Sequence, residues 1–281
     1  MIVMNRFDHL RANARSSLLG WFRLAARSPF FAIRLLVLRA GFFATRRLLF
    51  VLRDPRGFRI DGRHPLISYW DFFVQGALQD EEWVSEFRRH PHPVAVDIGA
   101  NAGMFSYLLT GLNPKAEIYA FEPLPLMAES LRRVQEVSGN TFHIFSAACG
   151  PARGEATLCA DDPGDTDARL AVVGEGAKTQ RIKVPVLPVD EMVQAREILL
   201  MKIDTQGYEI PVLQGARQTL NRTRYLILEI VDEDELGRMQ SVLGPEWHAR
   251  RITVCDFLFS RGGPTSYRGA DGPGRADTLS K

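Results

Sequence analysis

The chain has 281 residues, of which 46% are hydrophobic and 24% are charged, and its net charge is only +2. This apolar fraction is normal for a folded protein, and the length suffices for one catalytic domain of about 190 residues with an appendage. Cys149, Cys159 and Cys255 form no C-x-x-C pair, which argues against a cysteine zinc site and a disulfide framework. We therefore expect free thiols and, because no signal peptide is evident, a cytoplasmic protein.

The charges are distributed unevenly along the chain. Residues 1–60 carry twelve arginines, no lysine and two aspartates, a net charge of +10, whereas the other 221 residues carry 23 basic and 31 acidic side chains, a net charge of −8. A split of this kind predicts a basic arm with a partner of its own.

The basic arm is predicted to be helical over residues 5–53, with a break near Ser28-Pro29. Arginines interrupt its apolar side chains, so no uncharged run approaches the roughly 18 residues that a spanning helix needs. A basic helix with an apolar face is typical of attachment to an anionic membrane surface, here peripherally on the inner face of the membrane. The alternative is packing on the catalytic domain or on another subunit of an oligomer, and nothing in the motifs below favours nucleic acid.

Turn-forming residues and changes in composition divide the chain into four parts. The turn at Asp54–Gly57 ends a basic amphipathic helical arm, residues 1–60. Residues 61–93 form a helical lead-in, and residues 94–260 form the catalytic domain. The tail, residues 261–281, is rich in Gly, Pro, Ser and Arg and is predicted to be disordered.

The catalytic domain shows the alternation of strands and helices expected of a doubly wound, Rossmann-like α/β fold with a mostly parallel seven-stranded sheet. The predicted strands lie near residues 93–97, 117–121, 141–146, 198–204, 224–230 and, as a final pair, 247–260. The predicted helices lie near residues 102–112, 125–137, 208–220 and 232–242. Extra strands at 155–160 and 180–187 flank a loop, 161–178, that is either a lid whose Arg169 meets an anionic acceptor or a mobile surface loop.

The most informative stretch follows the first strand of this domain. That strand ends at Asp97, and the chain then turns through Gly99, Asn101 and Gly103 into a helix. The spacing D-x-G-x-N-x-G differs from the G-x-G-x-x-G of dinucleotide-binding proteins, and an acid before the first glycine would repel a pyrophosphate. The site therefore suits a cationic or zwitterionic ligand at the carboxyl end of the strand.

A second acid, Glu122, ends the next strand and is followed by Pro123. A carboxylate at this position is well placed to accept hydrogen bonds from both hydroxyls of a ribose. The alternative for Asp97 and Glu122 is that both are simply solvated strand ends.

Together with K-I-D-T-Q-G-Y-E at residues 202–209 and L-E-I at 228–230, these motifs resemble the FkbM family of class I S-adenosylmethionine-dependent methyltransferases. The resemblance spans roughly residues 94–259. It implies methylation of a hydroxyl on a sugar, glycolipid or secondary metabolite. One departure is Gln206, where the family usually carries Glu, so a role that needs a charge at this position is in doubt.

The resemblance also assigns residues to the methyl donor. Asp97, Gly99, Asn101 and Gly103 are expected around the methionine portion of the donor, and Glu122 is expected at its ribose. The adenine is expected near the end of the third strand, at Ser146, Ala147 and Ala148, and the alternative is that these residues simply end the strand.

The predicted catalytic residues come from the third motif. Asp204 is a candidate general base, positioning acceptor or cation ligand, and Lys202 points to the same face of the strand and can orient it. Glu209 is the third catalytic candidate. A less favoured alternative is a divalent cation held by the carboxylates of Asp204, Glu209 and Glu229.

Two other functions remain open at this point. One is a nicotinamide-dependent oxidoreductase on a similar sheet, against which the missing G-x-G-x-x-G argues. The other is a non-catalytic membrane-associated binding module, for which Gln206 is the only indication.

Overall fold

The computed structural model describes residues 21–45, 52–60, 69, 82–160, 169–170 and 180–261, apart from positions 23, 57, 231 and 254. Within these residues the predicted α/β fold is confirmed. The predicted disorder of residues 261–281 concerns a segment that, apart from its first residue, lies outside the described residues.

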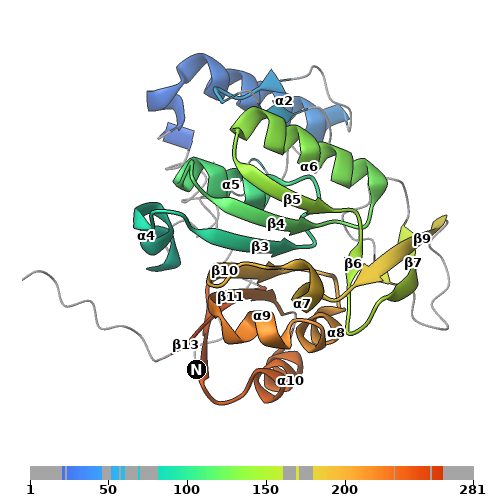
Figure 1. Cartoon of the computed structure of the whole chain (residues 1–281). Helices are drawn as coiled ribbons and strands as arrows, with labels where there is room; N and C mark the ends of the chain where they lie inside the picture. Colours follow the sequence, from blue (N-terminus) through green and yellow to red (C-terminus); the bar gives the residue numbers. More distant parts are fainter. Residues whose placement is uncertain are drawn as a thin grey trace, which may run out of the picture.

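The centre of the molecule is a seven-stranded sheet with the order β12-β13-β11-β10-β3-β4-β5 (Figure 1). Strands β11, β10, β3, β4 and β5 run parallel, and β13 lies antiparallel between β11 and β12. In chain order the strands are β3 (Val94–Ile98), β4 (Glu117–Phe121), β5 (Thr141–Phe145), β10 (Ile198–Ile203), β11 (Thr223–Glu229), β12 (Trp247–Arg251) and β13 (Asp256–Arg261). Because the four inner parallel strands β3, β4, β10 and β11 are buried on both faces, they are mostly apolar, whereas the edge strand β5 is only partly buried.

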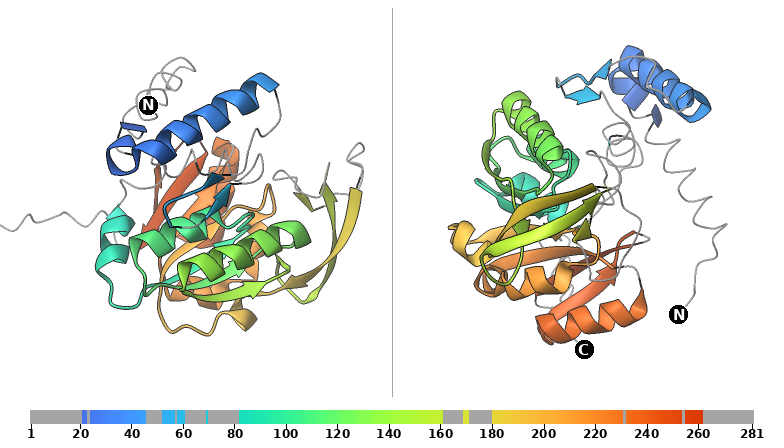
Figure 2. Two further views of the ribbon diagram at one scale, coloured as in Figure 1. Left: turned by 90° about the horizontal axis from the view of Figure 1, so that it is seen from above. Right: turned by 90° about the vertical axis from the view of Figure 1, so that its right-hand side faces the viewer.

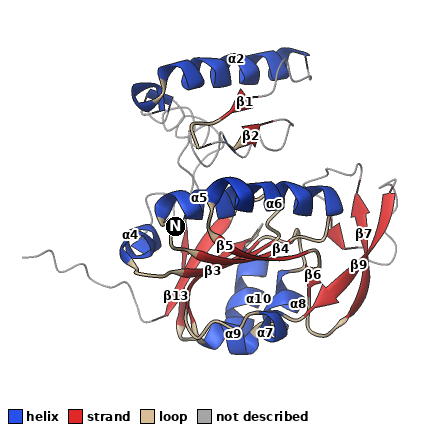
Figure 3. Ribbon diagram, turned by 45° about the horizontal axis from the view of Figure 1, so that its top comes forward, coloured by secondary structure: helices blue, strands red, loops and turns tan. Residues whose placement is uncertain are grey.

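Helices cover both faces of this sheet (Figure 3). One face carries α4 (Glu82–Arg89), α5 (Met104–Leu112) and α6 (Pro125–Ser138). The other carries α7 (Val189–Met192), α8 (Glu209–Gln214), α9 (Arg217–Asn221) and α10 (Glu233–Leu243). Each face has its own apolar core, and alternate residues of every strand contribute to one core or the other.

The helix predicted over residues 208–220 is divided into α8 and α9. The division falls at Gly215, where an added Cβ would lie only 2.0 Å from the carbonyl oxygen of Gly150. The backbone therefore passes too close to a neighbouring segment for an ordinary side chain, and the chain turns there.

A smaller four-stranded sheet lies at one end of the molecule and has the order β6-β9-β7-β8 (Figure 1). Its members are β6 (Ala148–Cys149), β7 (Gly154–Ala160), β8 (Arg169–Leu170) and β9 (Gln180–Leu187). Strands β7 and β9 are the predicted extra strands. Apart from β8, the loop at 161–178 lies outside the described residues, so its function as a lid stays a prediction.

The described part of the N-terminal arm is mostly helical, with the predicted break at Ser28, and α2 (Pro29–Thr45) follows it. Helix α2 lies outside the layer of α5 and α6 (Figure 2). The predicted helix does not reach residue 53, because β1 (Leu52–Arg53) pairs with β2 (Arg59–Ile60) in a hairpin. Among the described residues, no helix has the length and apolar character needed to span a membrane.

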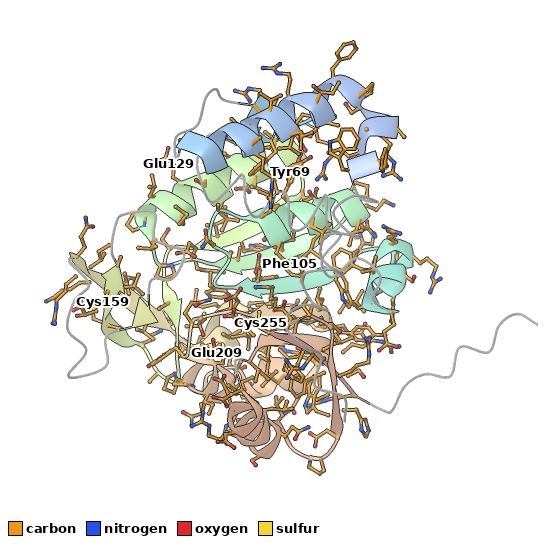
Figure 4. All side chains as sticks on the ribbon, turned by 180° about the vertical axis from the view of Figure 1, so that it is seen from behind. Tyr69, Phe105, Glu129, Cys159, Glu209 and Cys255 are labelled. Atoms are coloured by element: carbon orange, nitrogen blue, oxygen red, sulfur yellow. The ribbon has the colours of Figure 1, made fainter. Side chains whose placement is uncertain are left out.

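A buried carboxylate attaches this hairpin to the catalytic domain. Asp54 accepts hydrogen bonds from the hydroxyls of Tyr69, at 3.1 Å, and Tyr107 of α5, at 2.8 Å. It also accepts backbone hydrogen bonds from Arg56 and Phe58. Figure 4 shows Tyr69 between α2 and the helices of the domain. The arm is thus anchored by polar as well as apolar contacts.

Candidate active site

The loop after β3 has the backbone geometry that its glycines predict. Gly99, Asn101 and Gly103 have φ of +76°, +52° and +82°, in the left-handed region. The amides of Gly99 and Ala100 both donate to the carbonyl of Phe121 at 3.0 Å. A Cβ on Gly99 would lie 1.8 Å from the carbonyl oxygen of Asp204, so this loop is pressed against the end of β10. The loop therefore joins two predicted motifs in space.

Asp97 is completely buried at the end of β3. Its Oδ2 accepts a hydrogen bond of 2.6 Å from the hydroxyl of Ser106, whereas its Oδ1 has no hydrogen-bond partner among the described residues. Burial raises the pKa of Asp97, although the nearby charge of Lys202 opposes this. A buried carboxylate oxygen without a donor is unusual, and it leaves acceptor capacity unused at the end of β3.

Glu122 holds the same loop from the neighbouring strand. Its two oxygens accept backbone hydrogen bonds from Asn101 at 2.8 Å and from Leu124 at 2.7 Å. Burial raises the pKa of Glu122 to about 7 against the effect of these two bonds. Each oxygen keeps acceptor capacity, so the predicted contact with a ribose is compatible with this geometry.

Ser146 and Ala147 follow β5 at the same edge of the sheet, where the amide of Glu122 donates to the carbonyl of Phe145 at 3.0 Å. Ala147 is buried. Ser146 is exposed, and its hydroxyl accepts a hydrogen bond from Arg132 at 3.0 Å. The adenine contact of these two residues stays a prediction.

Lys202 and Asp204 form an ion pair at the end of β10. Lys202 is the register neighbour of Asp97, and its Nζ lies 2.6 Å from Oδ2 of Asp204. The side chain of Lys202 is 7% exposed and that of Asp204 is 29% exposed. Surrounding carboxylates raise the pKa of Lys202, and the lysine charge lowers the pKa of Asp204 against burial. Lys202 can therefore orient Asp204, which is the more exposed member of the pair.

Gln206 connects Asp204 to the next strand. Its Nε2 donates to Oδ1 of Asp204 at 3.1 Å and to Oε2 of Glu229 at 2.8 Å. Its backbone is left-handed, with φ of +56°. Burial, and then the charge of Asp204, raises the pKa of Glu229 to about 8. An amide can donate to both carboxylates, which an ionised glutamate at this position could not do.

One member of this charged group was missed from the sequence. Asp256 of β13 is the register partner of Glu229 and lies on the same face as Lys202. Burial raises the pKa of Asp256, and the charge of Lys202 opposes this. Its sequence neighbours carry no motif, so only the pairing of the two strands reveals it. The buried Lys202 is therefore surrounded by carboxylates from the carboxyl ends of β3, β10 and β11 and from the start of β13.

Glu209 has a different position from the other predicted catalytic residues. Its Oε1 accepts hydrogen bonds from the amide and hydroxyl of Thr205, at 3.0 and 3.1 Å, and from the amide of Gly207 at 3.1 Å. The side chain is buried at the start of α8, on the opposite side of the sheet from Phe105 of α5 (Figure 4). In the structure Glu209 shapes the turn that carries Gln206.

The carboxylates of the metal alternative do not converge. Among the residues that the structure describes, no group of three or more His, Cys, Asp or Glu side chains is arranged to hold a metal ion. Glu209 faces its own turn, whereas Asp204 and Glu229 lie together and both accept from the amide of Gln206. The three cysteines are free thiols.

The model of the methyltransferase FkbM domain matches residues 97–249, which is more than half of the chain. The chain belongs to the FkbM methyltransferase family. The match contains the glycine loop, the Lys202–Asp204 pair and Glu229, and membership implies S-adenosylmethionine as the methyl donor. It favours methyl transfer over the nicotinamide oxidoreductase considered above.

Two curated relatives have names that state the reaction or the substrate. The 2-O-methyltransferase NoeI of Sinorhizobium fredii is 27% identical over 163 residues, covering 51% of this chain and 65% of that protein. The hexuronic acid methyltransferase AglP of Haloferax volcanii is 24% identical over 151 residues, covering 52% of this chain and 60% of that protein. The matches thus span less than two thirds of these relatives.

Solved structures of methyltransferases also align with the chain. The METTL16 methyltransferase domain has a TM-score of 0.43 at 10% identity, covering 81% of this chain and 91% of that domain. A precorrin-6y C5,15-methyltransferase from Geobacter metallireducens has a TM-score of 0.37 at 14% identity, covering 64% of this chain and 84% of that one.

Proposed function

We propose that this protein transfers a methyl group from S-adenosylmethionine to a hydroxyl of a sugar, present on a glycan, a glycolipid or a secondary metabolite. The observation that carries the proposal is the unpartnered, buried Oδ1 of Asp97 beside a glycine loop that is pressed against Asp204. The names of NoeI and AglP, which state 2-O-methylation and a hexuronic acid substrate, support the acceptor class.

The residues around the loop fit this methyl donor. Oδ1 of Asp97 is an acceptor for the ammonium group of its methionine portion, and Glu122 has acceptor capacity for the ribose hydroxyls. Left-handed Gly99 and Gly103 let the loop turn tightly at the end of β3, with Gly99 against the carbonyl of Asp204. When bound, the sulfonium supplies an activated methyl group, and the protein has to align an acceptor and remove its proton.

The proton of the acceptor hydroxyl goes to the pair formed by Asp204 and Glu229. Lys202 lowers the pKa of Asp204 and makes it a weak base, whereas the pKa of Glu229 is raised to about 8. A base is most effective when its pKa is near the working pH. We therefore assign proton acceptance to Glu229 and orientation of the hydroxyl to Asp204, and of the three functions considered for Asp204 from the sequence we keep that of positioning acceptor.

Lys202 and Gln206 support this pair without touching the acceptor. The buried ammonium of Lys202 fixes Oδ2 of Asp204, and the amide of Gln206 keeps Asp204 and Glu229 together. The amide of Gln206 donates to both carboxylates that we assign to catalysis. Its presence in place of Glu therefore argues against the non-catalytic binding module.

The test uses purified full-length protein, methyl-labelled S-adenosylmethionine and a panel of sugars, hexuronic acids and glycolipids. We expect label on a carbohydrate hydroxyl, as an ether that resists alkali, and at least a 100-fold lower rate for Asp204→Ala. Label released by alkali would indicate a carboxylate ester instead. Label only on amines, or equal labelling by Asp204→Ala, would contradict the proposal.

A further inference from the structure

Helix α2 is apolar on both of its faces. Its inner face packs into the core of the domain through four buried side chains, those of Phe31, Ala32, Leu35 and Leu38. Its outer face, which we define as Phe30, Ile33, Leu36 and Val37, is 84%, 55%, 44% and 49% exposed, respectively. The spacing of three and four residues places these side chains along one side of the helix.

This cluster differs from the scattered apolar residues that every protein surface carries. Among the described residues, seven large hydrophobic side chains are exposed, and five of them lie between residues 22 and 37. The other two, Leu126 and Val242, lie singly on α6 and α10. A contiguous exposed patch of this kind marks a surface that binds something apolar.

The charge of the arm indicates what the outer face binds. Residues 1–60 have a net charge of +10 from twelve arginines and two aspartates, and Arg34 of α2 is exposed. A second copy of the chain would bring an arm of the same charge, and the two arms would repel each other. An anionic lipid surface offers both the opposite charge and an apolar layer.

We propose that the outer face of α2 binds an anionic membrane surface and that the helix lies along it. Its 17 residues form a rod of about 25 Å, and no described helix can span a membrane. Phe30, Ile33 and Val37 enter the boundary between headgroups and acyl chains, while arginines contact lipid phosphates. Because the inner face packs into the domain core, the membrane holds the whole domain in one orientation. This inference stands independently of the acceptor proposed above.

The experiment measures sedimentation of the full-length protein with vesicles. One set contains phosphatidylcholine alone, and the other contains phosphatidylcholine with 30% phosphatidylglycerol. The outer-face variant is Phe30→Ser, Ile33→Ser, Val37→Ser, and the control is Leu126→Ser, Val242→Ser, which removes exposed apolar side chains of α6 and α10. We expect the native protein and the control to bind anionic vesicles, and the outer-face variant to bind at least tenfold more weakly.

Two further readings separate this proposal from its competitors. Vesicle binding of the native protein should weaken in 0.5 M salt, because salt screens the attraction between arginines and lipid phosphates. S-adenosylhomocysteine should bind equally to all three proteins, which would confirm that the variants are folded. Equal sedimentation of the outer-face variant and the native protein would overturn the proposal. So would a native dimer in light scattering that does not bind vesicles and that the outer-face variant converts to a monomer, because the face would then join two copies.

Discussion

Lys202 is buried among the carboxylates of Asp204, Asp97 and Asp256, and its single charge influences all three. It lowers the pKa of Asp204, with which it pairs directly, but it does not overcome burial at Asp97 and Asp256. Burial and the charge of Asp204 raise the pKa of Glu229 to about 8, so Glu229 is the stronger base of the two. Environment thus gives chemically similar side chains different pKa values.

The pH dependence of methyl transfer follows from this difference. Below a pH of about 8 Glu229 holds a proton and cannot accept another, so the single-turnover rate should rise with pH and level off above that value. In Glu229→Gln this limb should disappear and the rate should fall by roughly 100-fold or more. The control is Glu129→Gln, an exposed glutamate of α6 (Figure 4). An unchanged rising limb in Glu229→Gln would exclude Glu229 as the base.

The glycine loop gives a second prediction for a single residue. Gly99→Ala places a methyl group against the backbone carbonyl of Asp204, at a left-handed residue. Gly139→Ala is the matched control, because Gly139 has φ of +69° but no atom lies within 4 Å of its Cβ position. We expect Gly139→Ala to cost about 1–2 kcal/mol of unfolding free energy in urea, and Gly99→Ala to cost more and to abolish cofactor binding. Equal stability of the two variants would show that the loop is not pressed against β10.

Among the elements, the hairpin of β1 and β2 connects the arm to the domain through Asp54. This carboxylate satisfies two tyrosine hydroxyls and two backbone amides in a buried position. Arg56 adds a cation–π contact, since its guanidinium lies 3.7 Å from the centre of the Tyr107 ring. The hairpin is therefore fixed to Tyr69 and to α5 even though its two strands are only two residues long.

Removing this carboxylate should loosen the arm. Asp54→Ala leaves four donors without their acceptor, and we expect the free energy of unfolding to fall by about 3 kcal/mol. Asp232→Ala, which removes the exposed N-cap of α10, should cost only about 1 kcal/mol. Urea denaturation measures both. A loss in Asp54→Ala no larger than that in Asp232→Ala would mean that the hairpin contributes little to stability.

For the whole molecule, the sequence predicts the parallel sheet and the glycine loop because these depend on local patterns of apolar runs, acids and glycines. It does not predict the division at Gly215, because that depends on the approach of Gly150 from a distant segment. It also misses Asp256, which joins the site only through the antiparallel register of β13 with β11. For Glu209 the motif indicates importance, but only the hydrogen bonds show that it shapes a turn.

The central claim is that Asp97 and the loop after it bind a sulfonium cofactor, and calorimetry tests it most directly. Purified full-length protein is titrated with S-adenosylhomocysteine and, separately, with a nicotinamide dinucleotide. We predict binding of the first only. In Asp97→Asn we predict binding about 10- to 100-fold weaker, as expected for loss of a charge-assisted hydrogen bond of about 1.5–3 kcal/mol. Tight nicotinamide binding without S-adenosylhomocysteine binding, or equal affinity in Asp97→Asn, would contradict the account.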